Sequence, residues 1–228
     1  MKIAVFSDIH GNINALKSVL SNIESEEVFD IFCLGDLLNG GVGGDEIISL
    51  LIEHQVKCVL GNHDAFLLDS TEQEFPEHLK KIASSMREWT VQHISQPSLE
   101  YLASLPRILR HEFSSGHKVI FCHSTPSSLW ELEALKWSAP KDDVKRAFGL
   151  LNAEIICHGH FHEGTGIRMI DENILVNVAS VGTHPDHLAN YSVIEFTSDQ
   201  IGIQQKRVRY DWEDELKRMK NQKVPMVG

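Results

Sequence analysis

The chain has 228 residues, of which 42% are hydrophobic, and a formal net charge of −11 at pH 7. This length and composition fit one large domain with a buried core. An extended nucleic-acid groove and an anionic membrane surface both require clustered Lys and Arg, so the charge argues against both partners. The negative net charge is compatible with bound divalent cations, because such ions make the local potential positive around clustered acidic residues.

We expect no signal peptide, because only Ile-Ala-Val-Phe separates Lys2 from Ser7 and Asp8, which is too short for an apolar signal-peptide core. No apolar run approaches the length of a membrane span. The four cysteines each lie in or at the end of a short apolar run, which predicts free, buried thiols rather than disulfides. We therefore expect a cytoplasmic protein with reduced Cys33, Cys58, Cys122 and Cys157.

The first part of the chain alternates between strands and helices. Short apolar strands are predicted at 2–7, 30–36 and 56–62, and apolar residues at helical spacing predict helices at 12–25 and 44–55. Strands that alternate with helices form a parallel sheet covered by helices.

The second part is mixed. Helices are expected at 76–94, at 98–106 after the break at Pro97, and at 141–151, and strands at 117–124 and 153–159. From about residue 166 the pattern indicates an antiparallel tail of short strands, closed by a helix at 211–220. The prediction is an α/β fold in a single domain, 1–228, with a helical insertion at about 65–106.

Unusual polar residues follow the apolar strands. In open α/β sheets the carboxyl ends of the strands form the ligand crevice, so we expect these side chains to meet. Eight residues occupy such positions: Asp8, His10, Asp36, Asn62, His63, His123, His160 and His162.

Seven of these residues form a mixed nitrogen and oxygen donor set without a thiolate. Such a set suits Mn²⁺, Fe, Zn²⁺ or Ni²⁺ better than Ca²⁺, which prefers oxygen alone. Seven donors are too many for one tetrahedral zinc and fit two ions that share a carboxylate. The sequence Cys-His-Gly-His-Phe-His at 157–162 leaves a local alternative open, since three alternate histidines on a strand can converge on one zinc.

The order of the motifs along the chain favours two metal ions over the local three-histidine zinc site. Five short motifs resemble the five signature blocks of the calcineurin-like metallophosphoesterase superfamily and follow the same order. They are Asp8-x-His10, Gly35-Asp36, Gly61-Asn62-His63-Asp64, His123 and Gly159-His160-x-His162. The opening AVFSDIHGN and the NVASVG stretch at 177–182 resemble the small bacterial and archaeal phosphodiesterase branch, which includes diadenosine-tetraphosphatase-like proteins.

The resemblance implies a four-layer αββα sandwich of two mixed β-sheets flanked by helices. It implies two divalent transition-metal ions, Mn²⁺ before Fe, Ni or Zn, the first held by Asp8, His10, Asp36 and His162. The second ion is then held by Asp36, Asn62, His123 and His160, so that the Asp36 carboxylate bridges the two ions. His63 matches the catalytic histidine, and a metal-bridging hydroxide is the nucleophile. The implied substrate is a small nucleotide-like phosphodiester or phosphoanhydride.

Some positions depart from the family pattern or have no counterpart in it. Asn39 stands where some members carry an Asp that supports the catalytic histidine, and the Arg expected near 183–190 is missing. Asn12 and Asn39 are the expected substrate contacts. His158 has no counterpart, which favours a packed histidine over a ligand. The glycine-rich run 39–44 lacks the Lys of a P-loop and is interpreted as a turn near the metals.

Several smaller expectations complete the site. Cys122 and Cys157 adjoin proposed ligands and should point into the core by strand alternation. His184 and His187 follow the 177–182 stretch in a loop that we expect near the site, where a solvated loop is favoured and a substrate contact is the alternative.

Two other functions share this pattern. A retromer subunit has this fold with a degraded site, so a non-catalytic protein-binding scaffold is the main alternative. A scaffold has no need of His63 or of all seven ligands, and this chain keeps them. A nuclease would share the metal site, but the short acidic chain argues against it.

Overall fold

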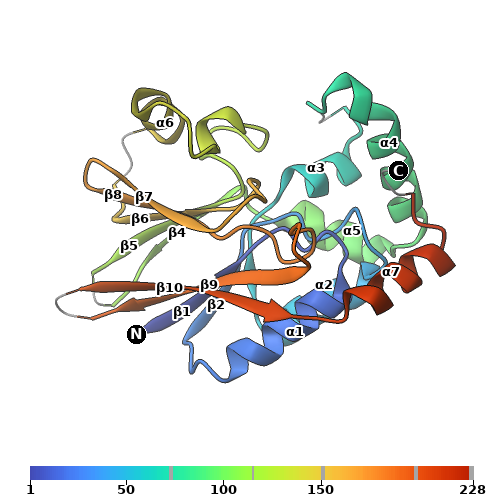
Figure 1. The fold of residues 1–228 in the computed structure, drawn as a ribbon, viewed down its shortest axis with the longest axis horizontal. Coiled ribbons are helices and arrows are strands. Elements are labelled where there is room, and N and C mark those ends of the chain that lie inside the picture. The colour runs from blue at the N-terminus through green and yellow to red at the C-terminus, as the bar shows by residue number, and fades with distance from the viewer. Residues whose placement is uncertain (72–73, 115, 150–151, 198–199, 226–228) are drawn as a thin grey trace.

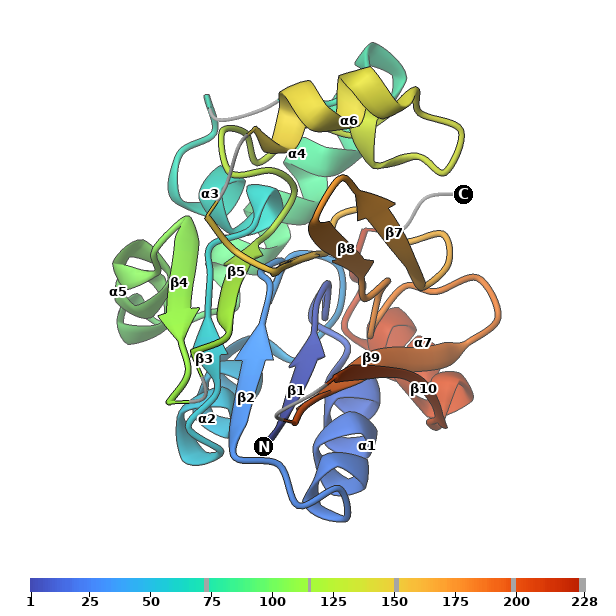
Figure 2. The ribbon, with the colours of Figure 1, turned by 90° about the vertical axis from the view of Figure 1, so that its left-hand side faces the viewer.

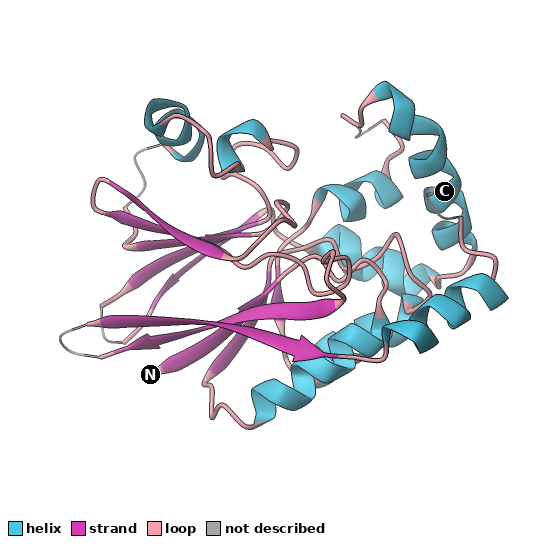
Figure 3. Cartoon of the chain, viewed as in Figure 1, coloured by secondary structure: helices cyan, strands magenta, loops and turns pink. Residues whose placement is uncertain are grey.

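A computed structural model describes residues 1–71, 74–114, 116–149, 152–197 and 200–225. Two five-stranded sheets lie face to face, with helices on their outer sides (Figure 1). The layers are clearest in Figure 3, where the strands are magenta and the helices cyan. This architecture confirms the predicted αββα sandwich.

The first sheet has the strand order β10-β9-β1-β2-β3. Its parallel part consists of β1 (Lys2–Phe6), β2 (Asp30–Cys33) and β3 (Lys57–Cys58). The long strands β9 (Leu188–Phe196) and β10 (Ile201–Arg209) extend the sheet antiparallel beyond β1. The end of the chain therefore pairs with its beginning.

The second sheet has the order β4-β5-β6-β8-β7. Its central strands β5 (Lys118–Cys122), β6 (Ile155–His158) and β8 (Asn173–Asn177) are parallel. The edges are antiparallel and consist of β4 (Ile108–Glu112) and β7 (Gly166–Ile170). The expected antiparallel tail is thus divided between the sheets, and its strand β8 is parallel to β6.

The core between the sheets follows the alternation of strand side chains. Val5, Phe32, Phe121 and Cys157 point into this layer and are buried. The rings of Phe32 and Phe121 stack across it with centroids 3.9 Å apart. Burying each such ring contributes about 1.5–3 kcal/mol, so this layer holds the two sheets together.

Helices cover the outer faces of both sheets (Figure 2). The first sheet packs on α1 (Ile13–Glu24) and α2 (Gly44–Glu53), and α6 (Lys141–Phe148) packs on the second. The segment between β3 and β4 forms α3 (Asn62–Leu68), α4 (Glu77–Gln92) and α5 (Gln96–Ser104), and α7 (Trp212–Asn221) ends the fold. A 3₁₀ turn spans Glu133–Leu135.

Four local predictions need correction. The third strand, expected at 56–62, is only two residues long, and Asn62 already begins α3. Pro97 does not separate two helices but lies in the first turn of α5, where its missing N–H costs nothing. Strand β4 was not predicted, because its sequence Ile-Leu-Arg-His-Glu lacks a clear alternation. The helix predicted at 141–151 ends at Phe148, and residues 150–151 lie outside the described part.

All four cysteines are free and buried, as expected. Among the described residues, no helix combines the length and the hydropathy that crossing a bilayer requires.

Candidate metal centre

The polar loops that follow the strands meet at one edge of the sandwich. Residues there with left-handed backbone conformations include Asp8 (φ 58°), His10 (φ 49°), Asp36 (φ 53°), Asn39 (φ 71°) and His160 (φ 62°). Such conformations cost of order 1–3 kcal/mol each in non-glycine residues and cluster at functional sites. The chain therefore maintains strain at the point where these side chains converge.

The first group of donors comes from β1, β2 and the loop after β6. The ligand atoms of Asp8, His10, Asp36 and His162 all lie within 4.8 Å of one another. His162 Nε2 is 3.1 Å from Asp8 Oδ1 and 3.2 Å from His10 Nε2. The structure thus brings together the four residues predicted for the first ion.

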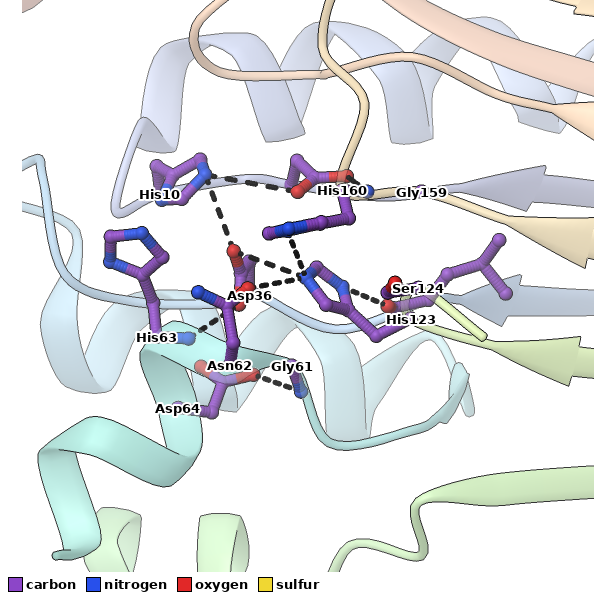
Figure 4. Close-up of polar contacts among 12 residues, drawn as sticks. His10, Asp36, Gly61, Asn62, His63, Asp64, His123, Ser124, Gly159 and His160 are labelled. Carbon is purple, nitrogen blue, oxygen red and sulfur yellow. Dashed lines mark hydrogen bonds and ion pairs between the residues drawn. The ribbon is translucent and has the colours of Figure 1, made fainter. Parts of the chain in front are cut away.

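The second group shares Asp36 with the first (Figure 4). Asp36 Oδ2 lies 3.4 Å from His123 Nε2, which lies 3.2 Å from His160 Nδ1. The amide oxygen of Asn62 is 2.7 Å from the same nitrogen of His123. All seven predicted ligands are therefore adjacent, although Asn62 reaches the site from a helix and not from a strand.

The donor set fits divalent metal ions. Asp36 Oδ2 is buried and has no hydrogen-bond partner among the described residues, which is costly for a carboxylate. His10 Nδ1 and His123 Nδ1 donate to the carbonyls of Asn39 (3.2 Å) and Leu34 (2.8 Å). Each Nε2 lone pair then faces the centre, the arrangement that backbone carbonyls impose on metal-binding histidines.

Burial sets the charge states of these groups. It raises the pKa of Asp36 well above its usual range, reinforced by the nearby Asp8 and Asp64 carboxylates. Burial, followed by His162, lowers the pKa of His10 to about 3. Burial raises the pKa of Asp8, but the neighbouring His162 and other histidines reverse this effect and lower it overall. His10 is therefore neutral near pH 7, the state in which imidazole binds metals.

Asp64 supports the site, and the sequence analysis gave it no role. Its fully buried carboxylate accepts hydrogen bonds from the backbone N–H groups of Leu37 (3.0 Å), Leu38 (3.3 Å) and Gly61 (3.1 Å). It thereby joins the loop after Asp36 to the start of α3. The sequence signal for Asp64 was its place at the end of the Gly-Asn-His-Asp motif, directly after His63.

Close backbone packing and a hydroxyl hold the loop after β6. A Cβ on Gly159 would collide with Ser7 and with the Asp8 carboxylate, so only glycine allows this approach. Thr183 Oγ1 lies 2.9 Å from His162 Nδ1, on the side of the ring away from Asp8. Sequence reasoning missed Thr183, because a hydroxyl that orients a ligand leaves no spacing pattern of its own.

His63 lies beside the cluster rather than within it. Asn39 Nδ2 donates to His63 Nδ1 over 2.9 Å, so Nδ1 accepts and the ring proton resides on Nε2. Burial, followed by the neighbouring His10, lowers the pKa of His63 well below its usual value. His63 also lines a cavity of about 490 Å³ that opens next to the cluster.

The remaining predicted residues have other surroundings. Asn12 caps α1 through Ala15 N (3.0 Å) and donates to Gly182 O (2.9 Å), although it also lines the cavity. His158 is buried under α6 beside Phe148 and belongs to neither donor group. This position disfavours the alternative of three strand histidines around one zinc.

The loop histidines point elsewhere. His184 contacts Asp186, 2.6 Å away, and the ring of His187 stacks on Trp212.

Comparison with known proteins decides the family. The profile of the calcineurin-like phosphoesterase superfamily domain matches residues 1–199. The chain belongs to the calcineurin-like phosphoesterase superfamily. The predicted class, a metal-dependent phosphoesterase, is thereby confirmed at the level of the family.

Individual relatives of this phosphoesterase agree with the assignment. An uncharacterized protein of Methanocaldococcus jannaschii is 30% identical, with 98% of this chain and 93% of that protein covered. A symmetrical bis(5′-nucleosyl)-tetraphosphatase of Ectopseudomonas mendocina is 29% identical over 64% of this chain, but the match spans only 53% of that enzyme. The crystal structure of a metallophosphoesterase from Sphaerobacter thermophilus shares the fold, with a TM-score of 0.73, 24% identity and coverage of 99% and 95% of the two chains.

Proposed function

We propose that this phosphoesterase is a dinuclear enzyme that hydrolyses a phosphodiester or phosphoanhydride bond in a nucleotide-type substrate. The observation that carries the proposal is the pair of donor groups that share Asp36. One ion would be held by Asp8, His10, Asp36 and His162, and the other by Asp36, Asn62, His123 and His160.

The chemistry of the proposed reaction follows from this arrangement. When bound, two divalent cations supply activation of water and neutralise the charge that develops on the phosphoryl oxygens. The chain contributes preorganisation, because the buried ligands have fixed positions and need little rearrangement during the reaction. The nitrogen and oxygen donors favour Mn²⁺ or a similar transition metal.

His63 would act on the substrate directly. With Nδ1 accepting from Asn39, its Nε2–H is free to donate to a phosphoryl or leaving-group oxygen in the adjacent cavity. The low pKa of His63 makes the neutral ring the relevant form at pH 7. We therefore propose a hydrogen-bond donor at this position, one that Asn39 orients without adding charge.

The names of several relatives and the size of the cavity beside the metal centre support a nucleotide-type substrate. Some matched relatives are named for bis(5′-nucleosyl) tetraphosphates, and the match to one of them covers 64% of this chain. A cavity of about 490 Å³ lies beside the cluster, within the range of about 300–1,000 Å³ for small-molecule sites.

The test is hydrolysis of a chromogenic phosphodiester by metal-stripped protein reloaded with Mn²⁺, Ni²⁺, Fe²⁺ or Zn²⁺. We expect activity to return with at least one ion, at about two ions per chain by elemental analysis. A protein that retains less than one ion per chain and hydrolyses no mono-, di- or polyphosphate would support the scaffold alternative instead.

A further inference from the structure

The cavity next to the metal centre has one wall that the proposed chemistry does not use. His10, His63 and His162 form the side that faces the metals. Another part of the lining is apolar and consists of residues from α4, α7 and the segment before α4: Phe75, Leu79, Ile82, Ala83, Met86 and Met219. The same space thus joins a phosphate-binding edge to an apolar surface.

The wall arises from an amphipathic helix whose apolar face does not pack on a sheet. Leu79, Ile82, Ala83 and Met86 follow the spacing i, i+3, i+4 and i+7, which places them on one face of α4. Of these, Ala83 is buried, whereas the larger three are only half-buried and line the cavity. This face is therefore available to a ligand.

Contacts between α4 and the end of the chain fix the second part of the wall. The indole nitrogen of Trp89 donates to the carbonyl of Gln222 over 3.2 Å, which ties α4 to the C-terminal end of α7. Met219 from α7 lines the same cavity as the histidines. In Figure 1 both helices lie on the same side of the molecule.

The charge of the cavity excludes a second anionic group. Among the described residues that line it, none is Lys or Arg, and the one carboxylate is that of Glu215. Arg87 is next to Met86 in sequence, but it donates to the carbonyls of Phe66 (2.6 Å) and Leu67 (3.0 Å). A row of phosphates needs cationic partners, so a polyphosphate chain would not be stabilised here.

The side chains of the wall favour a flat aromatic ligand over a flexible alkyl chain. The Phe75 ring lies edge-on to His63, with centroids 5.3 Å apart, and edge-on to Trp130 at 4.8 Å. Aromatic rings prefer such edge and offset contacts, and methionine thioethers pack favourably against ring edges. Met86 and Met219 provide two such sulfur atoms.

We propose that this cavity binds the uncharged aromatic group of an organic phosphate ester, such as the base of a nucleotide, while the phosphoryl group lies at the metal centre. This inference rests on the proposed phosphoesterase function and narrows its substrate class. Esters with one aromatic group beside the reacting phosphate are favoured over inorganic polyphosphate.

The test is calorimetric titration of Mn²⁺-loaded protein with phenylphosphonate and methylphosphonate. Neither compound is hydrolysed, and the first carries a phenyl group on phosphorus where the second carries a methyl group. We expect phenylphosphonate to bind about ten-fold more tightly, the gain from partial burial of a phenyl ring. Met86→Gln and Ile82→Asn should each reduce this preference to about two-fold through the loss of apolar contact, with the methylphosphonate affinity unchanged. Glu88→Gln, on an exposed position of α4, is the control and should preserve the preference.

The outcomes separate the two proposals. Equal affinities of wild-type protein for both phosphonates would overturn the aromatic site and leave the phosphoesterase proposal intact. If neither phosphonate binds to the metal-loaded protein, both proposals fail. If the preference persists in both folded variants, the ring binds elsewhere and the assignment to α4 is wrong.

Discussion

The two sides of the cavity are built on different principles. The metal side consists of polar residues, most of them buried, from the loops after β1, β2, β5 and β6 and from the start of α3, held in place by backbone hydrogen bonds and left-handed conformations. The apolar side consists of side chains from α4, α7 and the segment before α4, most of them half-buried. Rigid polar geometry serves the reaction, which tolerates little displacement, whereas an apolar wall can accept related ligands.

The largest effect expected on the metal side comes from Asp36→Asn. Both donor groups use this carboxylate, so the substitution should reduce binding of both ions and lower kcat/KM by about 10³-fold. Elemental analysis and hydrolysis of a chromogenic phosphodiester measure the two quantities. Full metal content with full activity would show that Asp36 does not bridge.

His63→Ala should separate catalysis from metal binding. His63 belongs to neither donor group, so the metal content should stay the same while kcat falls by about 10²–10³-fold. His78→Ala removes an exposed histidine of α4 and serves as the matched control. A parallel loss of metal in His63→Ala would instead make this residue part of the metal cradle.

Thr183→Val should have an intermediate effect. The substitution keeps the shape of the side chain and removes the hydroxyl that lies 2.9 Å from His162 Nδ1. Partners of this kind typically contribute about 10–100-fold in metal affinity, so titration with Mn²⁺ should show weaker binding at one of two sites. An unchanged dissociation constant would mean that the Thr183 hydroxyl does not orient His162.

His158→Ala should leave the metal content nearly intact, whereas His160→Ala should not. His158 packs beside Phe148 under α6, and only His160 belongs to a donor group. Elemental analysis of the two variants after identical purification makes the comparison. If only His158→Ala lost metal, the result would support the alternative of a local three-histidine site instead.

The smallest effect concerns acid stability. Burial lowers the pKa of His158 to about 4, below the 6.5 of the unfolded chain, so the unfolded state binds more protons between these values. Stability should therefore fall as the pH decreases from 6.5 to 4, by about 1.4 kcal/mol per pH unit for this residue. Denaturant unfolding of metal-free protein should show a shallower decline in His158→Ala. Equal slopes would mean that His158 is not buried as a neutral ring.

The sequence predicted the metal side better than the apolar side. Asp8, Asp36 and His123 follow apolar strands, and the carboxyl ends of parallel strands meet at one edge, so their convergence could be inferred. Thr183 and Asp64 could not be assigned a role, because hydrogen bonds to ligands and loops have no periodic signature.

The apolar wall was not predictable for another reason. Leu79, Ile82 and Met86 have the spacing of a helix that packs on a core, and spacing alone does not reveal that a face lines a cavity. The predicted length of β3 was too great, because Val59 and Leu60 follow the strand and are buried. Their apolar side chains continue the pattern of a strand although they lie outside it.

One boundary suggests how the enzyme can diverge. The superfamily profile ends at residue 199, whereas Met219 and Glu215 of the cavity lie beyond it on α7. Every proposed metal ligand lies before that boundary. If the cavity binds the aromatic group as proposed, mutations in the last helix would alter ligand preference while leaving every proposed metal ligand in place.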